Sequence, residues 1–220
     1  MTFLIKEILK KVIYKLGFMT SIDWSSRVKE MGEDSVYDSR TLNKDKFQTN
    51  KEQTELYSKL INREMSSCNI KRILDYGCGI GRHHKFLSSL KSLEPKAEII
   101  GFDPTVELLK FSRGKGYTNV TDQFNHALKY DLIFCHMVLG GLNDKEVLLA
   151  IKNMISSLNS RGRIILVESV NNIQERLYTK WRVRSKESYM PQIPDFEWSI
   201  LGEIYENDDC LKIIRGKFSI

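Results

Sequence analysis

The pattern of apolar and polar positions changes in character along the chain. From about residue 70, short apolar runs alternate with stretches in which apolar residues recur every three or four positions, and these predict strands and helices. The expected strands are Lys71–Asp75, Glu98–Asp103, Asn119–Phe124, Tyr130–Met137 and Arg163–Glu168. The expected helices are Arg82–Leu93, Thr105–Arg113 and Asp144–Leu158, the last with Asp144 as its N-cap. This alternation is typical of an α/β domain whose parallel sheet carries helices on both faces.

The C-terminal part follows a different pattern. The stretch Ile173–Lys186 is basic and is expected to be helical. Two further strands are expected at Phe196–Glu206 and Cys210–Gly216. They are joined by Asn207-Asp208-Asp209, residue types that tolerate tight-turn geometry. The sheet should therefore end in an antiparallel hairpin.

The first 50 residues differ from the rest and divide the chain into three parts. Residues 1–18 place apolar side chains at helical spacing and lysines opposite them, which predicts a basic amphipathic helix. Such a helix can lie on an anionic membrane surface or dock on its own domain or a partner subunit. Residues 19–50 are polar and weakly periodic, and we expect them to form a cap or flap. Residues 51–220 are expected to form the main domain.

Composition narrows the class of protein. A chain of 220 residues with 41% hydrophobic residues is expected to form one globular domain and is too apolar to be disordered. No run of about 20 apolar residues predicts a membrane-spanning helix. The four cysteines form no CxxC pair, which argues against a zinc site or a disulfide framework and favours a cytoplasmic protein. The net charge of +6 suits an anionic cofactor, a membrane surface or nucleic acid without choosing among them.

The segment Ile73–Arg82 carries the most specific chemical signal. It reads ILDYGCGIGR, so an expected strand runs into a turn with three glycines before a helix begins. Glycine lets the backbone approach a ligand closely, and a helix N-terminus offers unpaired N–H groups. Asp103 follows 22 residues after Gly81 at the end of the next strand, where an acid can accept both hydroxyls of a ribose.

Two kinds of cofactor fit a strand followed by a glycine-rich turn. Dinucleotide-binding folds space their glycines G-x-G-x-x-G, whereas the spacing here is G-x-G-x-G. Asp75 precedes the first glycine by two residues and would repel a pyrophosphate but attract an ammonium group. S-adenosylmethionine has an ammonium, a sulfonium and a ribose but no phosphate, so the electrostatics favour it over NAD.

Taken together, these motifs resemble those of the class I S-adenosylmethionine-dependent methyltransferases. The family's first motif is similar to ILDYGCGIGR and its second to EIIGFDP; its fourth and fifth strand motifs are similar to YDLIFCHMVLGGLND and SRGRIILVE. The resemblance covers residues 50–216. It implies a Rossmann-like three-layer α/β sandwich whose mostly parallel, seven-stranded sheet ends in an antiparallel hairpin. It also implies methyl transfer from S-adenosylmethionine, with S-adenosylhomocysteine as the product.

The resemblance implies a set of cofactor contacts. The glycine turn is expected at the methionine part, Asp103 at the ribose and Pro104 beside the adenine. Two flap residues, Tyr37 and Arg40, are expected to close over the cofactor carboxylate. The other expected contacts are Asp75, Gly77, Cys78, Gly79 and Gly81 at the turn, Asp122 and Gln123 near the adenine amine, and Cys135 near the methyl group.

Catalysis by such a protein consists mainly of positioning the nucleophile and, where needed, removing a proton. His136 ends the fourth expected strand and is the candidate base, with a structural histidine beside the pocket as the alternative. His83 and His84 are expected to serve packing or to face solvent. Many small-molecule relatives carry a Glu-His pair where this chain has Gly140-Gly141, so we expect a more open pocket there. The acidic cluster of metal-dependent relatives is also missing, which predicts a metal-independent enzyme.

The acceptor has to be predicted separately, because a fold does not name a substrate. The stretch Asn171–Asp195 interleaves basic and aromatic residues, which suits a sugar, a base or a phosphate. A further resemblance, to methyltransferases of surface-polysaccharide pathways with a Lys-rich N-terminal helix, favours a hydroxyl of a sugar, glycan or other small molecule. The alternatives are an RNA- or protein-directed methyltransferase and a non-catalytic cofactor-binding subunit. The modest net charge disfavours nucleic acid, and residues 1–18 leave peripheral membrane contact open.

Overall fold

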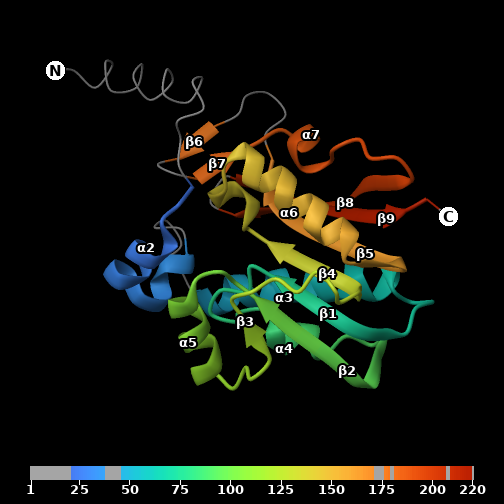
Figure 1. Cartoon of the computed structure of the whole chain (residues 1–220), viewed down its shortest axis with the longest axis horizontal. Coiled ribbons are helices and arrows are strands. Elements are labelled where there is room, and N and C mark those ends of the chain that lie inside the picture. The colour runs from blue at the N-terminus through green and yellow to red at the C-terminus, as the bar shows by residue number, and fades with distance from the viewer. Residues whose placement is uncertain (1–20, 38–45, 171–175, 179–180, 207–208, 220) are drawn as a thin grey trace.

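The computed structural model describes residues 21–37, 46–170, 176–178, 181–206 and 209–219 (Figure 1). The expected helix over residues 1–18 and the flap residue Arg40 lie outside the described residues. In the part of the chain that is described, no helix is both long and apolar enough to cross a membrane.

The described residues form a seven-stranded sheet with the strand order β3-β2-β1-β4-β5-β9-β8. Strands β1 to β5 pair in parallel, whereas β9 runs antiparallel to both β5 and β8. The predicted mostly parallel sheet with a terminal antiparallel hairpin is therefore confirmed. The strands are β1 (Ile70–Tyr76), β2 (Leu93–Phe102), β3 (Val120–Thr121), β4 (Tyr130–His136), β5 (Leu158–Ser169), β8 (Phe196–Glu206) and β9 (Asp209–Phe218).

Helices cover both faces of this sheet, which makes the predicted three-layer sandwich (Figure 1). Alternate residues of β4 enter opposite cores, as a doubly covered strand requires. Leu132 and Phe134 pack under α3 (Lys46–Glu64) and α4 (His84–Leu87), and Ile133 and Cys135 pack under α6 (Asp144–Ser156). All four side chains are fully buried, so the sheet is fixed from both sides.

The expected cap contributes two short helices at one end of the sheet. They are α2 (Trp24–Met31) and the 3-10 helix η1 (Gly32–Val36). Val28 of α2 packs on Ile80 of the glycine turn and on Leu108 of α5 (Val106–Gly114). The first part of the flap thus rests directly on the segment expected to hold the cofactor.

The helix expected at Arg82–Leu93 is much shorter in the structure. Helix α4 ends at Leu87, and β2 already begins at Leu93. The hydroxyl of Ser88 donates to the carbonyl of His84, and that of Ser89 donates to Phe86. Serine side chains that bond to nearby carbonyls offer the backbone an alternative to continued helix, which explains the early end.

The prediction of a helix over Ile173–Lys186 is wrong. The structure instead has a two-stranded sheet of β6 (Arg176–Tyr178) and β7 (Trp181–Val183), followed by the short helix α7 (Lys186–Tyr189). Tertiary contacts of Trp181, Arg182 and Arg184 override the local helical pattern. These contacts are described with the site, because they bear on one of its walls.

The N-cap of helix α6 lies one residue earlier than expected. Its N-cap is Asn143 and not Asp144. The Asn143 side chain accepts from the backbone N–H of Glu146, and the Glu146 carboxylate accepts from the backbone N–H of Asn143. This reciprocal capping box satisfies two N–H groups and leaves Asp144 free for other partners.

Candidate active site

The turn after β1 requires its three glycines. Gly77, Gly79 and Gly81 have φ values of 71°, 53° and 76°, a region that side chains with a Cβ rarely adopt. A Cβ on Gly77 would lie 2.3 Å from a methyl group of Val138, and one on Gly81 would lie 2.7 Å from the hydroxyl of Ser112. Beside Gly79 the nearest atom would be a methyl of Val36 at 3.4 Å. The turn therefore packs tightly at both ends and leaves its middle open toward the flap.

Two buried carboxyl groups flank this turn. Asp103 accepts from the backbone N–H of Gly79 at 3.0 Å and from that of Thr105 at 2.8 Å. Asp75 is 2% exposed, and its Oδ2 has no hydrogen-bond partner among the described residues. Burial raises the pKa of Asp75 to about 7, with the nearby Arg82 guanidinium opposing the shift.

A cavity of about 280 Å³ opens beside the turn at the carboxyl ends of the parallel strands. Its wall brings together several of the residues expected from the sequence. These are Gly77, Cys78, Gly79, Asp103, Pro104 and His136. The flap contributes Trp24 and Val36 to the same wall.

Other expected contacts lie away from this wall. Asp122 and Gln123 are exposed after β3, and Gln123 lines a separate hollow near Phe124. Cys135 is fully buried in the core under α6, where burial raises its thiol pKa well above the ordinary value. Gly81 faces Ser112 behind the turn.

The remaining expected contacts are Asp75 and Tyr37. Asp75 lies in β1 below the turn and is not part of the cavity wall. Tyr37 lies near the cavity without lining it, with its ring centroid 5.6 Å from the Arg82 guanidinium carbon.

The sequence analysis missed a polar cluster formed by Arg82, His83, His136 and Tyr57. Arg82 Nη2 lies 2.8 Å from His136 Nδ1, and Arg82 Nε donates to His83 Nε2 at 3.3 Å. The hydroxyl of Tyr57, on α3, lies 3.1 Å from His136 Nε2. The one sequence signal for this cluster is the position of Arg82 directly after the third glycine. No local pattern reveals the contact between Tyr57 and His136, because these residues are 79 positions apart.

The hydrogen bonds fix the protonation of His136. A guanidinium can only donate, so Nδ1 of His136 accepts from Arg82 and the ring proton is on Nε2, directed at Tyr57. Burial first, and then the Arg82 charge, hold the pKa of His136 well below its ordinary value. The expected base is therefore a neutral imidazole with both nitrogens in use, and it can accept a proton only by giving up Arg82.

The wall opposite the glycine turn is mainly apolar. It is built from the end of β4 and from α6, with the residues Met137, Val138, Leu142, Glu146, Leu149, Ala150 and Asn153. Met137 has a φ of 52°, which is uncommon for a residue with a side chain. Such strain is often found at functional sites, and here it turns the chain at the end of β4 into the cavity wall.

The Gly140-Gly141 pair does not open the pocket, contrary to the expectation. Both glycines belong to the 3-10 helix η2 (Leu139–Gly141) and are buried. A Cβ on Gly140 would lie 2.3 Å from the Trp181 ring, and one on Gly141 would lie 3.4 Å from the rings of Trp181 and Trp24. Trp181 of β7 thus occupies the space beside both glycines.

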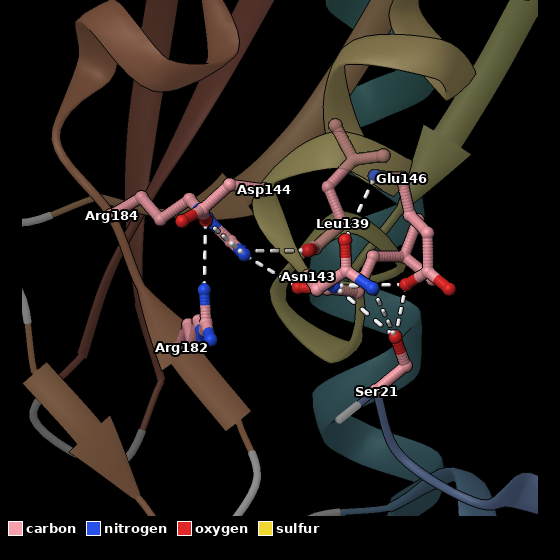
Figure 2. A network of polar contacts seen from close by, with 8 residues as sticks. Ser21, Leu139, Asn143, Asp144, Glu146, Arg182 and Arg184 are labelled. Atoms are coloured by element: carbon pink, nitrogen blue, oxygen red, sulfur yellow. Dashed lines mark hydrogen bonds and ion pairs between the residues drawn. The ribbon is translucent and has the colours of Figure 1, made fainter. Parts of the chain in front are cut away.

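Arg184, which follows β7, holds the segment of η2 in place (Figure 2). Its side chain is 2% exposed and donates to the carbonyl of Leu139 at 2.8 Å and to that of Leu142. Asp144 accepts from both Arg184 and Arg182. This clamp, which consists of Arg182, Arg184 and Asp144, holds the chain between β4 and α6 in place.

On the other side of the same segment, Ser21 of the flap donates to the carboxylate of Glu146 (Figure 2). Glu146 also lines the cavity. Among the residues that the structure describes, no group of three or more His, Cys, Asp or Glu side chains could hold a metal ion. Metal independence stays a prediction.

Comparisons with known proteins agree with this geometry. The matching family model is described as a methyltransferase domain and covers residues 38–197. A search of curated proteins finds no match. One similar solved structure is the plantazolicin methyltransferase BpumL in complex with a pentazolic desmethylPZN analog and S-adenosylhomocysteine. It is 15% identical with a TM-score of 0.65, over 94% of this chain and 99% of that chain.

A second similar structure is magnesium protoporphyrin IX methyltransferase (ChlM) from Synechocystis PCC 6803 with bound S-adenosylhomocysteine. It is 15% identical with a TM-score of 0.61, over 96% of this chain and 98% of that chain. At such identities the similarity shows the fold alone, and neither structure supports the resemblance to surface-polysaccharide enzymes. The family model, however, spans well over half of the sequence, and the fold agrees with it. The chain therefore belongs to the class I S-adenosylmethionine-dependent methyltransferases.

Proposed function

We propose that the protein transfers the methyl group of S-adenosylmethionine to an oxygen atom of a small-molecule acceptor. The observation that carries this proposal is a single cavity whose wall includes the glycine turn, Asp103, and the Arg82–His136 pair. The cofactor supplies an electrophilic methyl group when bound. The chain then has to hold the acceptor against it and keep water out.

The residues present suit this cofactor. Gly79 leaves room for a ligand to approach the backbone in the middle of the turn, and Asp103 is a buried acid bonded to that glycine. Asp75 has an unsatisfied buried oxygen of the kind that an ammonium group would satisfy. No phosphate-binding cation is needed for such a ligand, in contrast to NAD.

The cavity's shape and charge support a small acceptor that reacts through oxygen. The flap residues Trp24 and Val36 form part of the cavity wall, and the cavity volume of about 280 Å³ suits a small acceptor better than a polymer. Arg82 places a fixed positive charge at the wall, which disfavours a protonated amine as acceptor. A sugar hydroxyl, which was expected from the sequence, stays a prediction that no comparison supports.

The test is to supply the purified protein with S-adenosylmethionine labelled in the methyl group and a cell extract divided into small molecules, protein and RNA. We expect the label to enter the small-molecule fraction. A variant with Asp103→Ala should show much less transfer, which controls for contaminating enzymes. Label in RNA or in protein alone would favour the alternatives and contradict the proposal.

A further inference from the structure

Arg82 carries a charge that no carboxylate of the described residues pairs with directly. None of the ion pairs found among these residues includes Arg82, whereas Arg72, Arg182, Arg184 and Arg215 all have acidic partners. Two of its N–H groups donate to the imidazoles of His83 and His136, and a guanidinium has five. Arg82 therefore has unused donors at the cavity wall.

The groups around Arg82 do not neutralise it. Both imidazoles accept from Arg82, and burial holds the pKa of each well below its ordinary value, so both are neutral. Asp75 is close enough to feel the charge, but its own pKa of about 7 leaves it partly protonated at neutral pH. The cluster thus presents a positive charge at a cavity wall that is mainly apolar and also includes the acids Asp103 and Glu146.

A carboxylate is the group that this arrangement fits. The planar fork of a guanidinium matches the two oxygens of a carboxylate, and such charge-assisted pairs are the strong ones inside proteins. The facing wall offers Met137, Val138, Leu142 and Leu149, together with Trp24 of the flap. These side chains suit an apolar or aromatic body attached to the acid.

We infer that the acceptor is an apolar carboxylic acid whose carboxylate binds Arg82 and receives the methyl group. This inference rests on the proposed function and names its substrate class. One carboxylate oxygen attacks the methyl carbon, the new O–CH3 bond forms as the S–CH3 bond breaks, and the sulfur keeps the electron pair. The products are a neutral methyl ester and S-adenosylhomocysteine. No proton leaves the acceptor, because a carboxylate is already ionised at neutral pH.

The state of His136 agrees with such an acceptor. A hydroxyl acceptor needs a group that takes its proton, and His136 has both ring nitrogens occupied by Tyr57 and Arg82. A carboxylate acceptor needs no base, so the imidazole can remain neutral and hold the guanidinium in position. In this account His136 is a positioning residue.

The methionine end of the cofactor is a second source of a carboxylate. Arg82 extends from the glycine turn toward the end of β4, where its guanidinium meets His136, and no hydrogen bond joins it to Asp75 among the described residues. The two sources can be separated experimentally. S-adenosylhomocysteine has the methionine carboxylate, whereas 5′-methylthioadenosine lacks it.

The experiment compares matched acids and amides as probes: benzoate with benzamide, and phenylacetate with phenylacetamide. Their affinities are measured calorimetrically for the full-length protein saturated with S-adenosylhomocysteine. We expect the acids to bind about tenfold or more tightly than the amides, because the amides cannot form the charge-assisted pair. Arg82→Met should abolish this preference, and Arg82→Lys should keep part of it. Arg63→Met, at a surface arginine whose side chain is 64% exposed, should behave like the unchanged protein.

Three results would overturn the inference. One is equal binding, or no binding, of acids and amides to the unchanged protein. Another is an Arg82→Met variant that loses affinity for S-adenosylhomocysteine but not for 5′-methylthioadenosine, which would assign Arg82 to the cofactor. The last concerns the methyl label from S-adenosylmethionine. The inference fails if the acids that bind do not become labelled, or if their label survives mild alkali, which cleaves esters but not ethers. If S-adenosylhomocysteine does not bind the unchanged protein at all, the proposed function itself fails.

Discussion

Asp103, at the end of β2, accepts from the backbone N–H of Gly79 in the glycine turn and from that of Thr105 at the start of α5. We expect Asp103→Ala to weaken the binding of S-adenosylhomocysteine by about 1–3 kcal/mol, through the loss of charge-assisted hydrogen bonds. Calorimetric titration measures this directly. Circular dichroism of the same sample separates a local loss from unfolding. An unchanged affinity would remove Asp103 from the cofactor site.

His136 offers a test of positioning against base catalysis. His136→Asn keeps an oxygen near the position of Nδ1 that can accept from Arg82, whereas His136→Ala removes it. If His136 only positions Arg82, turnover of the asparagine variant should stay within about tenfold of the unchanged protein, and the alanine variant should lose more. If His136 is a general base, both substitutions should lower turnover by about 10²–10⁴-fold. Steady-state rates of label transfer distinguish the two roles.

Individual site residues were predictable to different degrees. The residues that line the cavity from the glycine turn and from the end of β2 carry a local motif, so the sequence identifies Gly77, Gly79 and Asp103. The bond between Tyr57 and His136 joins a helix to a strand 79 residues apart, and no local pattern encodes it. Cys135 shows the opposite error: its position beside His136 suggested a contact, but the alternation of a strand directs it into the core.

At the scale of elements, the wall between β4 and α6 depends on close packing of Trp181 over η2. Gly140→Ala should destabilise the protein by about 1–3 kcal/mol, because its Cβ would lie 2.3 Å from the Trp181 ring. Gly114→Ala is the matched control, since nothing lies within 4 Å of a Cβ there and the site is helical. It should be neutral or slightly stabilising. Urea denaturation measures both changes, and equal effects would contradict the packing of Trp181 on Gly140.

The central strands β1, β4 and β5 were predictable because each contains an apolar run that is mostly buried, and such a run is directly visible in the sequence. The region of β6 and β7 was not. Its residues have a helical spacing of basic side chains, yet Arg182 and Arg184 turn inward to Asp144 and to the carbonyls of η2. These partners come from a segment about 40 positions earlier, so the local pattern gives no sign of them.

Across the whole molecule, stability should depend on pH through buried Glu168. Its Oε1 accepts from the backbone N–H groups of Val138 and Leu139, and burial raises its pKa from 4.5 to about 7. A raised folded-state pKa means that the folded protein binds the proton more tightly than the unfolded chain. The contribution of this group to the free energy of unfolding is therefore largest at low pH, and it is lost as the pH rises toward 7.

The matched variant is Glu168→Gln, which keeps an acceptor for both N–H groups but does not titrate. Relative to this variant, the unchanged protein should lose about 2–3 kcal/mol of stability between pH 5 and pH 8. Denaturant unfolding of both proteins at the two pH values isolates the group from other titrating residues. A constant difference between the two proteins would show that the carboxyl group is ionised at both pH values.

We expect the cavity at the carboxyl ends of the parallel strands to bind S-adenosylmethionine. The most direct measurement is calorimetric titration of the purified protein, stripped of bound ligand, with S-adenosylmethionine, S-adenosylhomocysteine and NAD. Both adenosyl ligands should bind at one site, and NAD should not bind. Binding of NAD alone, or of none of the three, would contradict this expectation.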